Sequence, residues 1–281
     1  MPIELATQFQ SAVDELFTTE SKKSLLTNTN YSWSGAHSIK VYSVSTAPMN
    51  DYGRNGPAEG NWSRYGEIND LDATTQELPL RKDRSFTFAV DTLDQDETKH
   101  ALQGASALAR QLREVTVPEV DRYVYTEMCK NAGQVPAAVK LSATNIYESI
   151  INGNKLLDDA EVPEIHRVLV VTPDSYLLMK KSRDIVLETD ITAQMLIKGV
   201  IALLDGLTVI KIPSTRLPND FGFMIVHPIA TVAPTKLESY KIHDNPPGIN
   251  GSLVEGRVTY DAYVLTNKRN AIFYQQTGKA S

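Results

Sequence analysis

The sequence is poor in cysteine and lacks long hydrophobic runs. Cys129 is the single cysteine among 281 residues, which excludes an internal disulfide framework and a cysteine-based zinc site. Apolar runs such as Val168–Val171 are far too short to span a bilayer, and the N-terminus has neither the basic nor the apolar region of a secretory signal. We therefore expect a chain that folds in a reducing cytoplasm and has no membrane partner.

The chain also lacks an excess of positive charge. Acidic residues outnumber basic ones by 34 to 28, giving a net charge of -6, which disfavours a protein whose main task is to grip nucleic acid. Two small basic clusters, 81–84 and 180–183, are interrupted or followed by acids. We interpret them as solvated faces or as ion pairs between subunits.

Catalytic and metal-binding motifs are missing as well. The five histidines show no metal-ligand spacing, and there is no nucleophile elbow or glycine-rich phosphate loop. His227 and Cys129 fit structural roles better than catalytic ones. We expect no catalytic residue, no metal and no cofactor. A hydrolase using Asp91, Asp94 or Glu97 stays open, although acids at a helix start are explained more simply by capping.

The first third of the chain contains a long stretch without apolar periodicity. Strands are predicted at 38–47 and at 84–91, where apolar and polar residues alternate. Residues 48–80 between them are rich in glycine and carry large aromatics, namely Tyr52, Trp62 and Tyr65. This predicts an extended β-hairpin arm whose aromatics need a partner to cover them. A flexible surface loop is the alternative.

Two helices stand out. Residues 3–19 carry an apolar stripe that includes Phe9, which predicts a helix packed on its own domain or on a neighbouring subunit. Residues 95–131 have helical spacing interrupted by Pro118. They form either one kinked helix of about 55 Å or two shorter helices.

The second half has a mixed α+β order without the regular spacing of a doubly wound sheet. Helices are predicted at 144–157 and 175–181, and a helix or an irregular segment at 192–204. Strands are predicted at 167–171, 207–212, 221–226, 230–236, 237–243, 256–264 and 271–275.

Several of these segments resemble the major capsid proteins of tailed bacteriophages. Arg84–Asp91 followed by Leu93–Glu97 resembles the end of their extended loop and the start of their spine helix, and Val117–Tyr123 resembles their mid-spine motif. The most specific similarity, to their C-terminal signature, covers Lys236–Gly251 with Glu255–Arg257 and Tyr260–Leu265. The resemblance implies an α+β, Hong Kong 97-like capsid fold with an N-terminal arm, an extended β-hairpin loop, a peripheral domain with a long spine helix, and an axial domain.

The resemblance also supplies boundaries and a function. It implies an arm at 1–30, an extended loop at 31–92, a peripheral domain at 93–135 and 229–281, and an axial domain at 136–228. The implied protein is not an enzyme but a structural one, which assembles into pentamers and hexamers of an icosahedral head around double-stranded DNA. The alternative with the same fold is an encapsulin-type nanocompartment shell subunit; a tail-tube subunit is disfavoured by the long helix.

Two departures from the family bear on the partners. Some relatives carry a long, cleaved scaffolding segment where this chain has residues 1–30, so we expect a separate scaffolding protein, besides a portal. A decoration protein stays open as a further partner. Residues 53–66 contain no lysine, so we expect no covalent crosslink from the loop tip. The resemblance implies assembly in the host cytoplasm and a place in the virion. The candidate contacts between subunits are Phe9, Tyr52, Trp62 and Tyr65.

Overall fold

The computed structural model describes residues 21–31, 38–57, 62–92, 104–182 and 200–278. The chain divides into two compact units. We call residues 36–79 the hairpin unit, and residues 1–35 together with 80–281 the body. Phe9 and the predicted helix at 3–19 lie outside the described residues.

The hairpin unit is an antiparallel ribbon. β1 (Ser38–Val44) pairs with β2 (Ala73–Pro79), in a register that runs from Ser38 opposite Pro79 to Val44 opposite Ala73. The predicted arm is therefore present, but its second strand is β2 and not the strand predicted at 84–91. That strand exists within residues 82–91 but belongs to a different sheet. β2 was not predicted, because its exposed, largely polar sequence carries no hydrophobic alternation.

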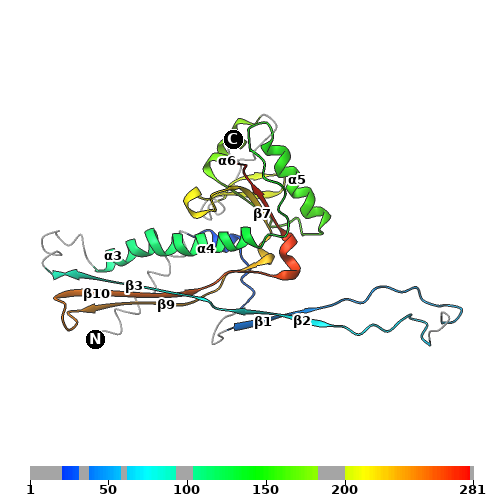
Figure 1. Ribbon diagram of the computed structural model, residues 1–281, viewed down its shortest axis with the longest axis horizontal. Coiled ribbons are helices and arrows are strands. Elements are labelled where there is room, and N and C mark those ends of the chain that lie inside the picture. Colours follow the sequence, from blue (N-terminus) through cyan, green and yellow to red (C-terminus); the bar gives the residue numbers. More distant parts are fainter. Residues whose placement is uncertain (1–20, 32–37, 58–61, 93–103, 183–199, 279–281) are drawn as a thin grey trace. The chain divides into compact units, whose positions relative to one another are not determined.

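The body contains two larger sheets and a set of helices (Figure 1). Its elements in chain order are η1 (Lys23–Leu25), β3 (Lys82–Asp91), α3 (Gly104–Gln111), η2 (Leu112–Thr116), α4 (Val117–Lys130), α5 (Ile146–Asp159), β4 (Val168–Val171), α6 (Pro173–Lys181), β5 (Val200–Leu204), β6 (Leu207–Lys211), η3 (Ser214–Arg216), β7 (Phe221–Val226), η4 (Pro228–Ala230), β8 (Thr231–Val232), β9 (Thr235–Asp244), β10 (Gly251–Tyr260), β11 (Tyr263–Val264), η5 (Thr266–Ala271) and β12 (Ile272–Gln276).

A three-stranded antiparallel sheet, in the order β3-β10-β9, lies along the helices α3 and α4 (Figure 1). Alternate residues of its strands face the helices and join their apolar side chains in one core, as Val254 and Val258 of β10 do. The residues between them, such as Glu255 and Arg257, are exposed. This one-sided burial explains the period-2 pattern that predicted strand 84–91.

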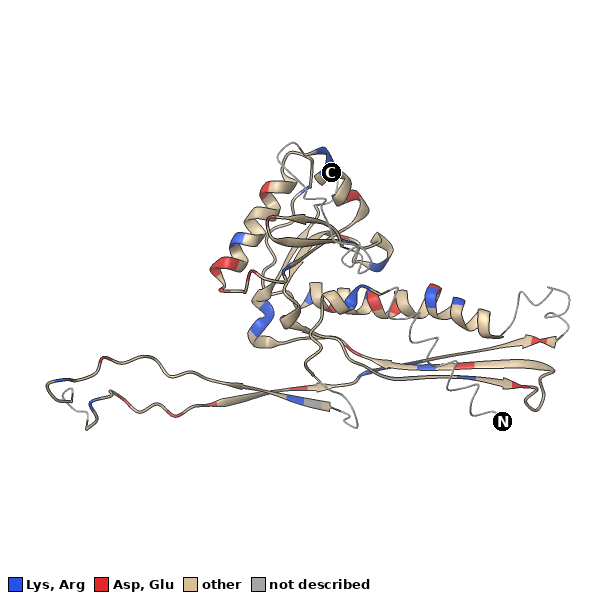
Figure 2. Cartoon of the chain, turned by 180° about the vertical axis from the view of Figure 1, so that it is seen from behind, with Lys and Arg blue, Asp and Glu red and all other residues tan. Residues whose placement is uncertain are grey.

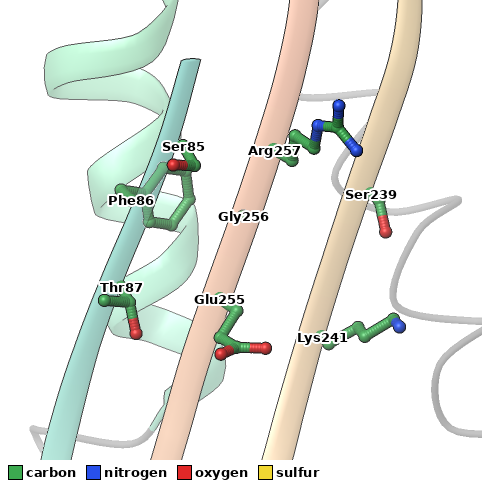
Figure 3. A pocket seen from close by; sticks show the side chains of 8 residues that line it. All are labelled: Ser85, Phe86, Thr87, Ser239, Lys241, Glu255, Gly256 and Arg257. Atoms are coloured by element: carbon green, nitrogen blue, oxygen red, sulfur yellow. The ribbon is translucent and has the colours of Figure 1, made fainter. Parts of the chain in front are cut away.

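Glycine is required at position 256 by its neighbours across the sheet. Gly256 of β10 is paired with Phe86 of β3 on one side and with Tyr240 of β9 on the other. A Cβ on Gly256 would overlap the Phe86 ring, which also stacks against Tyr240 with ring centroids 6.3 Å apart. Figure 3 shows the Phe86 ring beside the central strand, on which Gly256 carries no side chain between Glu255 and Arg257. The Glu255-Gly256-Arg257 segment of the capsid-like signature thus marks a ring-over-glycine contact.

Replacing this glycine tests that contact. Gly256→Val is expected to lower the free energy of unfolding by about 1–3 kcal/mol, because the added side chain must displace the Phe86 ring in a packed core. Glu255→Val, on the exposed face of the same strand, is the matched control and is expected to stay within about 1 kcal/mol of the original protein. Urea unfolding followed by circular dichroism measures both. Equal losses for the two variants would contradict the packing argument.

The long helix is continuous across Pro118. α3, the π-helical turn η2 and α4 follow one another without a gap from Gly104 to Lys130, and the residues at both junctions have right-handed helical dihedrals. The break into two separate helices is therefore wrong for the described residues, and 95–103 lie outside them. A proline cannot donate a hydrogen bond to the carbonyl four residues earlier, and its ring crowds that carbonyl. The π-helical turn η2 therefore lies where Pro118 interrupts the regular hydrogen bonds of the α-helix.

The second sheet has five strands in the order β12-β7-β4-β6-β5, with β4 parallel to β6 and the other neighbours antiparallel. α5 and α6 pack on one face of it, against residues such as Leu169 and Phe223. The core that contains α4 takes residues of the other face, such as Val170 and Met224. Burial on both faces explains why β4 and β7 are continuous apolar runs.

Most predicted elements of the body are confirmed to within a few residues, with three corrections. The strand expected at 230–236 is the turn η4 followed by the short strand β8, with β9 beginning at Thr235. The strand expected at 256–264 is the end of β10, which begins at Gly251, followed by the short strand β11. The segment 192–204 was expected to be helical or irregular, but Val200–Leu204 is strand β5. Its five apolar or small residues are too few for periodicity to separate a buried strand from a helix. Residues 192–199 lie outside the described part of the chain.

Candidate assembly surfaces

The loop between β1 and β2 continues the hairpin as a sparsely bonded ribbon. The Ser45 amide donates to the Asp72 carbonyl at 2.8 Å, and the Gly53 amide donates to the Arg64 carbonyl at 2.9 Å. Gly66 has a φ of +90°, a conformation that favours glycine, and a Cβ there would lie 2.6 Å from Asn50 side-chain atoms. The stretch without apolar periodicity is therefore the distal part of the arm.

Large hydrophobic side chains along this ribbon are exposed. They are Tyr42, Val44, Met49, Tyr52, Trp62, Tyr65, Ile68 and Leu71. Trp62 is 80% exposed and Tyr65 is 78% exposed. Single exposed apolar residues are ordinary, but so many in a unit that spans only 36–79 are typical of a surface that another chain covers.

The structure places three of the four predicted contact residues. Tyr52 and Tyr65 meet across the ribbon in an edge-to-face arrangement, with ring centroids 5.1 Å apart. Trp62 lies in the same loop, and Phe9 is outside the described residues. This side-chain contact joins the two sides of the ribbon where its backbone hydrogen bonds are few.

Where the chain enters the body after the hairpin unit, it is held by a buried carboxylate. Asp261 is fully buried and accepts hydrogen bonds from the Arg81 amide at 2.9 Å and from the Arg81 Nε at 3.1 Å. The hydroxyls of Tyr123 on α4 and Tyr263 on β11 donate to it at 2.8 and 2.7 Å, and the Ala262 amide at 2.8 Å. We call these residues the Asp261 anchor. It ties the start of β3 to α4 and to the end of β10.

A second carboxylate ties residues 21–31, which we call the N-terminal strap, to the body. Asp121 of α4 accepts from Ser21 Oγ at 2.6 Å, and the Asn28 amide donates to the Thr231 carbonyl at 2.7 Å. The strap therefore contacts both the long helix and the segment before β9.

The two buried aspartates have opposite pKa shifts. Burial raises the pKa of Asp121, because the hydrogen bonds from Ser21 and Arg216 offset only part of the lost hydration. Burial also acts to raise the pKa of Asp261, but there the hydrogen bonds from Arg81 and the other donors outweigh it and the pKa is lowered.

Comparisons with known proteins show what this arrangement resembles. The sequence matches no protein-family model and no curated protein. A solved structure from Mycobacterium phage Che8 is 18% identical, with 91% of this chain and 90% of that chain covered and a TM-score of 0.70. The mature capsid of bacteriophage PhiM1 is 11% identical over 88% and 84% of the chains with a TM-score of 0.67, and a virus-like particle from Pyrococcus furiosus is 12% identical over 97% and 99% with a TM-score of 0.59.

The chain has the phage capsid fold. The Hong Kong 97-like fold class expected from the resemblance is confirmed, since the likeness extends over about nine tenths of the chain. The elements of this capsid fold that the sequence indicated are the hairpin arm, the long helix and the C-terminal strands.

The capsid fold also contains contacts that sequence reasoning missed. Arg81 was noted only as part of a basic cluster and Asp261 only within the C-terminal signature, and 180 positions separate them. A paired arginine and aspartate at that separation leave no signal in a single sequence. The Asp121 contact with the strap was missed for the same reason.

The described residues also show where the candidate reactive groups lie in the capsid fold. Cys129 is buried, and burial raises the pKa of its thiol to about 12. His227 Nε2 lies 3.0 Å from the Ile165 carbonyl, and burial lowers the pKa of its imidazole. In the part of the chain that the structure describes, no helix could cross a membrane and no group of three His, Cys, Asp or Glu could hold a metal ion.

Proposed function

We propose that this chain is the major capsid protein of a tailed bacteriophage, with a structural and not a catalytic role. Copies assemble into pentamers and hexamers of an icosahedral head that encloses double-stranded DNA. The observation that carries the proposal is the capsid fold, which extends over about nine tenths of the chain and is shared with a mature phage capsid.

The exposed hairpin unit supports this role physically. Apolar area that another subunit covers contributes about 25 cal/mol per Å², less the cost of ordering the partners. The same patches recur in every copy, so closed symmetry repeats each modest contact many times. The net charge of -6 suits a wall along which DNA slides during packaging.

The proposal includes the division of the chain. Residues 1–30 form the arm, 31–92 the extended loop, 93–135 and 229–281 the peripheral domain, and 136–228 the axial domain. Two strands cross these bounds, because β3 pairs in the three-stranded sheet with β10 and β12 pairs in the five-stranded sheet with β7. Phe9, Tyr52, Trp62 and Tyr65 contact neighbouring subunits. The partners are further copies of the chain, a separate scaffolding protein and a portal, and a decoration protein stays open as a further partner. Assembly takes place in the host cytoplasm, and the product is part of the virion.

Electron microscopy tests the proposal. The purified full-length chain, alone and mixed with a candidate scaffolding protein, is expected to form closed shells of uniform size with hexamer and pentamer lattices in negative stain. Size-exclusion chromatography of the same samples is expected to show a large assembly in place of a monomer. A monomer under all of these conditions, in the presence of the scaffold, would refute the shell role.

A nanocompartment shell is the second candidate, favoured by the full-length similarity to the Pyrococcus furiosus virus-like particle. Such a shell assembles without a scaffold and contains protein cargo. Particles isolated from cells therefore separate the two proposals: nuclease-protected DNA of uniform length favours the phage head, and a co-purified cargo protein favours the nanocompartment.

A further inference from the structure

Lys180, from the basic cluster noted in the sequence, is part of a larger group of cations in the folded body. Tyr176 of α6 lies between two lysines from different elements. Lys180 Nζ is 5.7 Å from the centroid of its ring, and Lys211 Nζ, at the end of β6, is 5.5 Å from it. Cations over one aromatic face gain from the ring quadrupole, and here two like charges share a single ring.

Three more cations continue this group across the body. Lys22 of the strap donates to the Lys211 carbonyl at 2.9 Å. Arg216 of η3 and Arg122 of α4 follow, and the Arg122 Nε donates to the Thr215 carbonyl next to Arg216 at 3.0 Å. We call Lys22, Arg122, Lys180, Lys211 and Arg216 the cationic stripe.

The electrostatics agree with this geometry. The pKa of Lys22 is lowered, first by burial and then by the positive charges of Lys211 and Arg216. Lys22 is therefore close enough to both cations to be repelled by them. Figure 2 shows lysines and arginines spread over many elements, and the stripe takes one cation from each of five segments, so no single helix or strand shows it by itself.

The carboxylate that pairs with the stripe does not reach the surface. Asp121 is 1% exposed and accepts from Arg216 Nη1 at 3.0 Å. Arg122, Lys180 and Lys211 are exposed. The stripe is therefore a local positive surface on a chain whose net charge is -6.

The surroundings of the stripe favour phosphate over a protein partner. In the described residues of the strap, α4, β6 and η3, no large hydrophobic side chain is exposed; on α6, Leu177 is. Protein interfaces are usually centred on buried apolar or aromatic anchors, whereas a nucleic-acid backbone is held by lysine and arginine.

We propose that the cationic stripe binds the phosphate backbone of double-stranded DNA without reading its sequence. This rests on the proposed function, because a DNA-filled head brings its wall against the packaged duplex. The contact is weak and depends on salt. Binding displaces counterions from the DNA phosphates, and a higher salt concentration favours their return, so the affinity falls. A few such cations per subunit hold the outer layer of DNA without opposing its movement.

DNA binding by matched variants tests the stripe. Lys180→Gln/Lys211→Gln removes two stripe charges, and Lys140→Gln/Lys155→Gln removes two exposed charges elsewhere on the body. Fluorescence anisotropy with a short labelled duplex, on unassembled full-length subunits between about 50 and 200 mM salt, gives the slope of log affinity against log salt. The stripe pair is expected to reduce that slope by about 2, and the control pair to leave it unchanged. Circular dichroism checks that both pairs fold.

Three results would overturn the proposal. They are equal losses in the two pairs, no salt-dependent binding by the original protein, and tighter binding of polyglutamate than of DNA, which would point to an acidic protein partner. Shell assembly is scored separately by electron microscopy. Shells without DNA binding refute the stripe alone, and DNA binding without shells refutes the proposed function.

Discussion

Deleting residues 50–66 is expected to abolish shell formation while leaving a folded subunit. The deletion removes Trp62 and both members of the Tyr52–Tyr65 pair, the aromatic part of the exposed ribbon. It leaves β1 and β2 in register and touches no described element of the body, because the hairpin unit comprises residues 36–79 alone. Folding and assembly should therefore separate in this variant.

Point substitutions sharpen the test. Trp62→Ala/Tyr65→Ala removes only side chains, and Arg54→Ala/Asn55→Ala changes two exposed polar residues of the same loop. Truncating an aromatic anchor in an interface costs about 2 kcal/mol or more, close to thirtyfold in affinity. The aromatic pair is expected to raise the concentration needed for assembly, measured by light scattering, at least tenfold. The polar pair is expected to leave it within about twofold.

Normal shells from the deletion would remove the hairpin unit from the assembly contacts. Unfolding of the deletion variant, seen as a loss of the thermal transition in circular dichroism, would instead show that the ribbon stabilises its own chain. The aromatic pair keeps the test decisive in that case, because it leaves the backbone hydrogen bonds of the ribbon unchanged.

The sequence indicated the buried parts of this fold better than the exposed ones. β4 and β7 were predicted because burial on both faces demands continuous apolar runs. β2 left no such signal, because Leu78 is the single buried residue among its seven. The long helix was predicted as continuous or broken, and only its packing decided the question, since a proline permits both outcomes.

The candidate surfaces divide in the same way. Tyr52, Trp62 and Tyr65 were named as candidate contacts because large aromatics in a long glycine-rich loop can be recognised from the sequence alone. The Asp261 anchor and the cationic stripe were not, because each gathers residues from elements far apart in the chain. The pattern of a single sequence shows local periodicity and composition. The contacts of an anchor depend instead on which distant elements the fold brings together.

Replacing Asp261 by alanine is expected to be among the most destabilising single substitutions in the body. The Arg81 amide and the hydroxyls of Tyr123 and Tyr263 would lose a shared acceptor in a buried place. Breaking a buried charged network by removing one partner costs about 3–5 kcal/mol. Urea unfolding at neutral pH measures the loss. Asp244→Ala, at the exposed end of β9, is the control and is expected to change the free energy of unfolding by less than about 1 kcal/mol.

The pH dependence of unfolding distinguishes the charge of Asp261 from its shape. Its folded-state pKa is lowered, so the stability it contributes is present above its unfolded pKa of about 3.9 and is lost as the pH falls through the folded pKa. The original protein is therefore expected to lose stability steeply below about pH 4. Asp261→Asn keeps the shape but cannot titrate, so it should start less stable at pH 7 and lose less of its stability on acidification.

Asp121 sharpens the interpretation because its shift has the opposite sign. Its raised pKa means that protonation favours the folded state, a contribution that is present at low pH and lost as the pH rises through the folded pKa. Asp121→Asn should therefore steepen the acid loss that Asp261→Asn reduces. If Asp261→Asn steepens the acid limb of the unfolding curve as Asp121→Asn does, the hydrogen bonds to Asp261 do not outweigh its burial. The start of β3 would then be held by packing and not by the buried carboxylate.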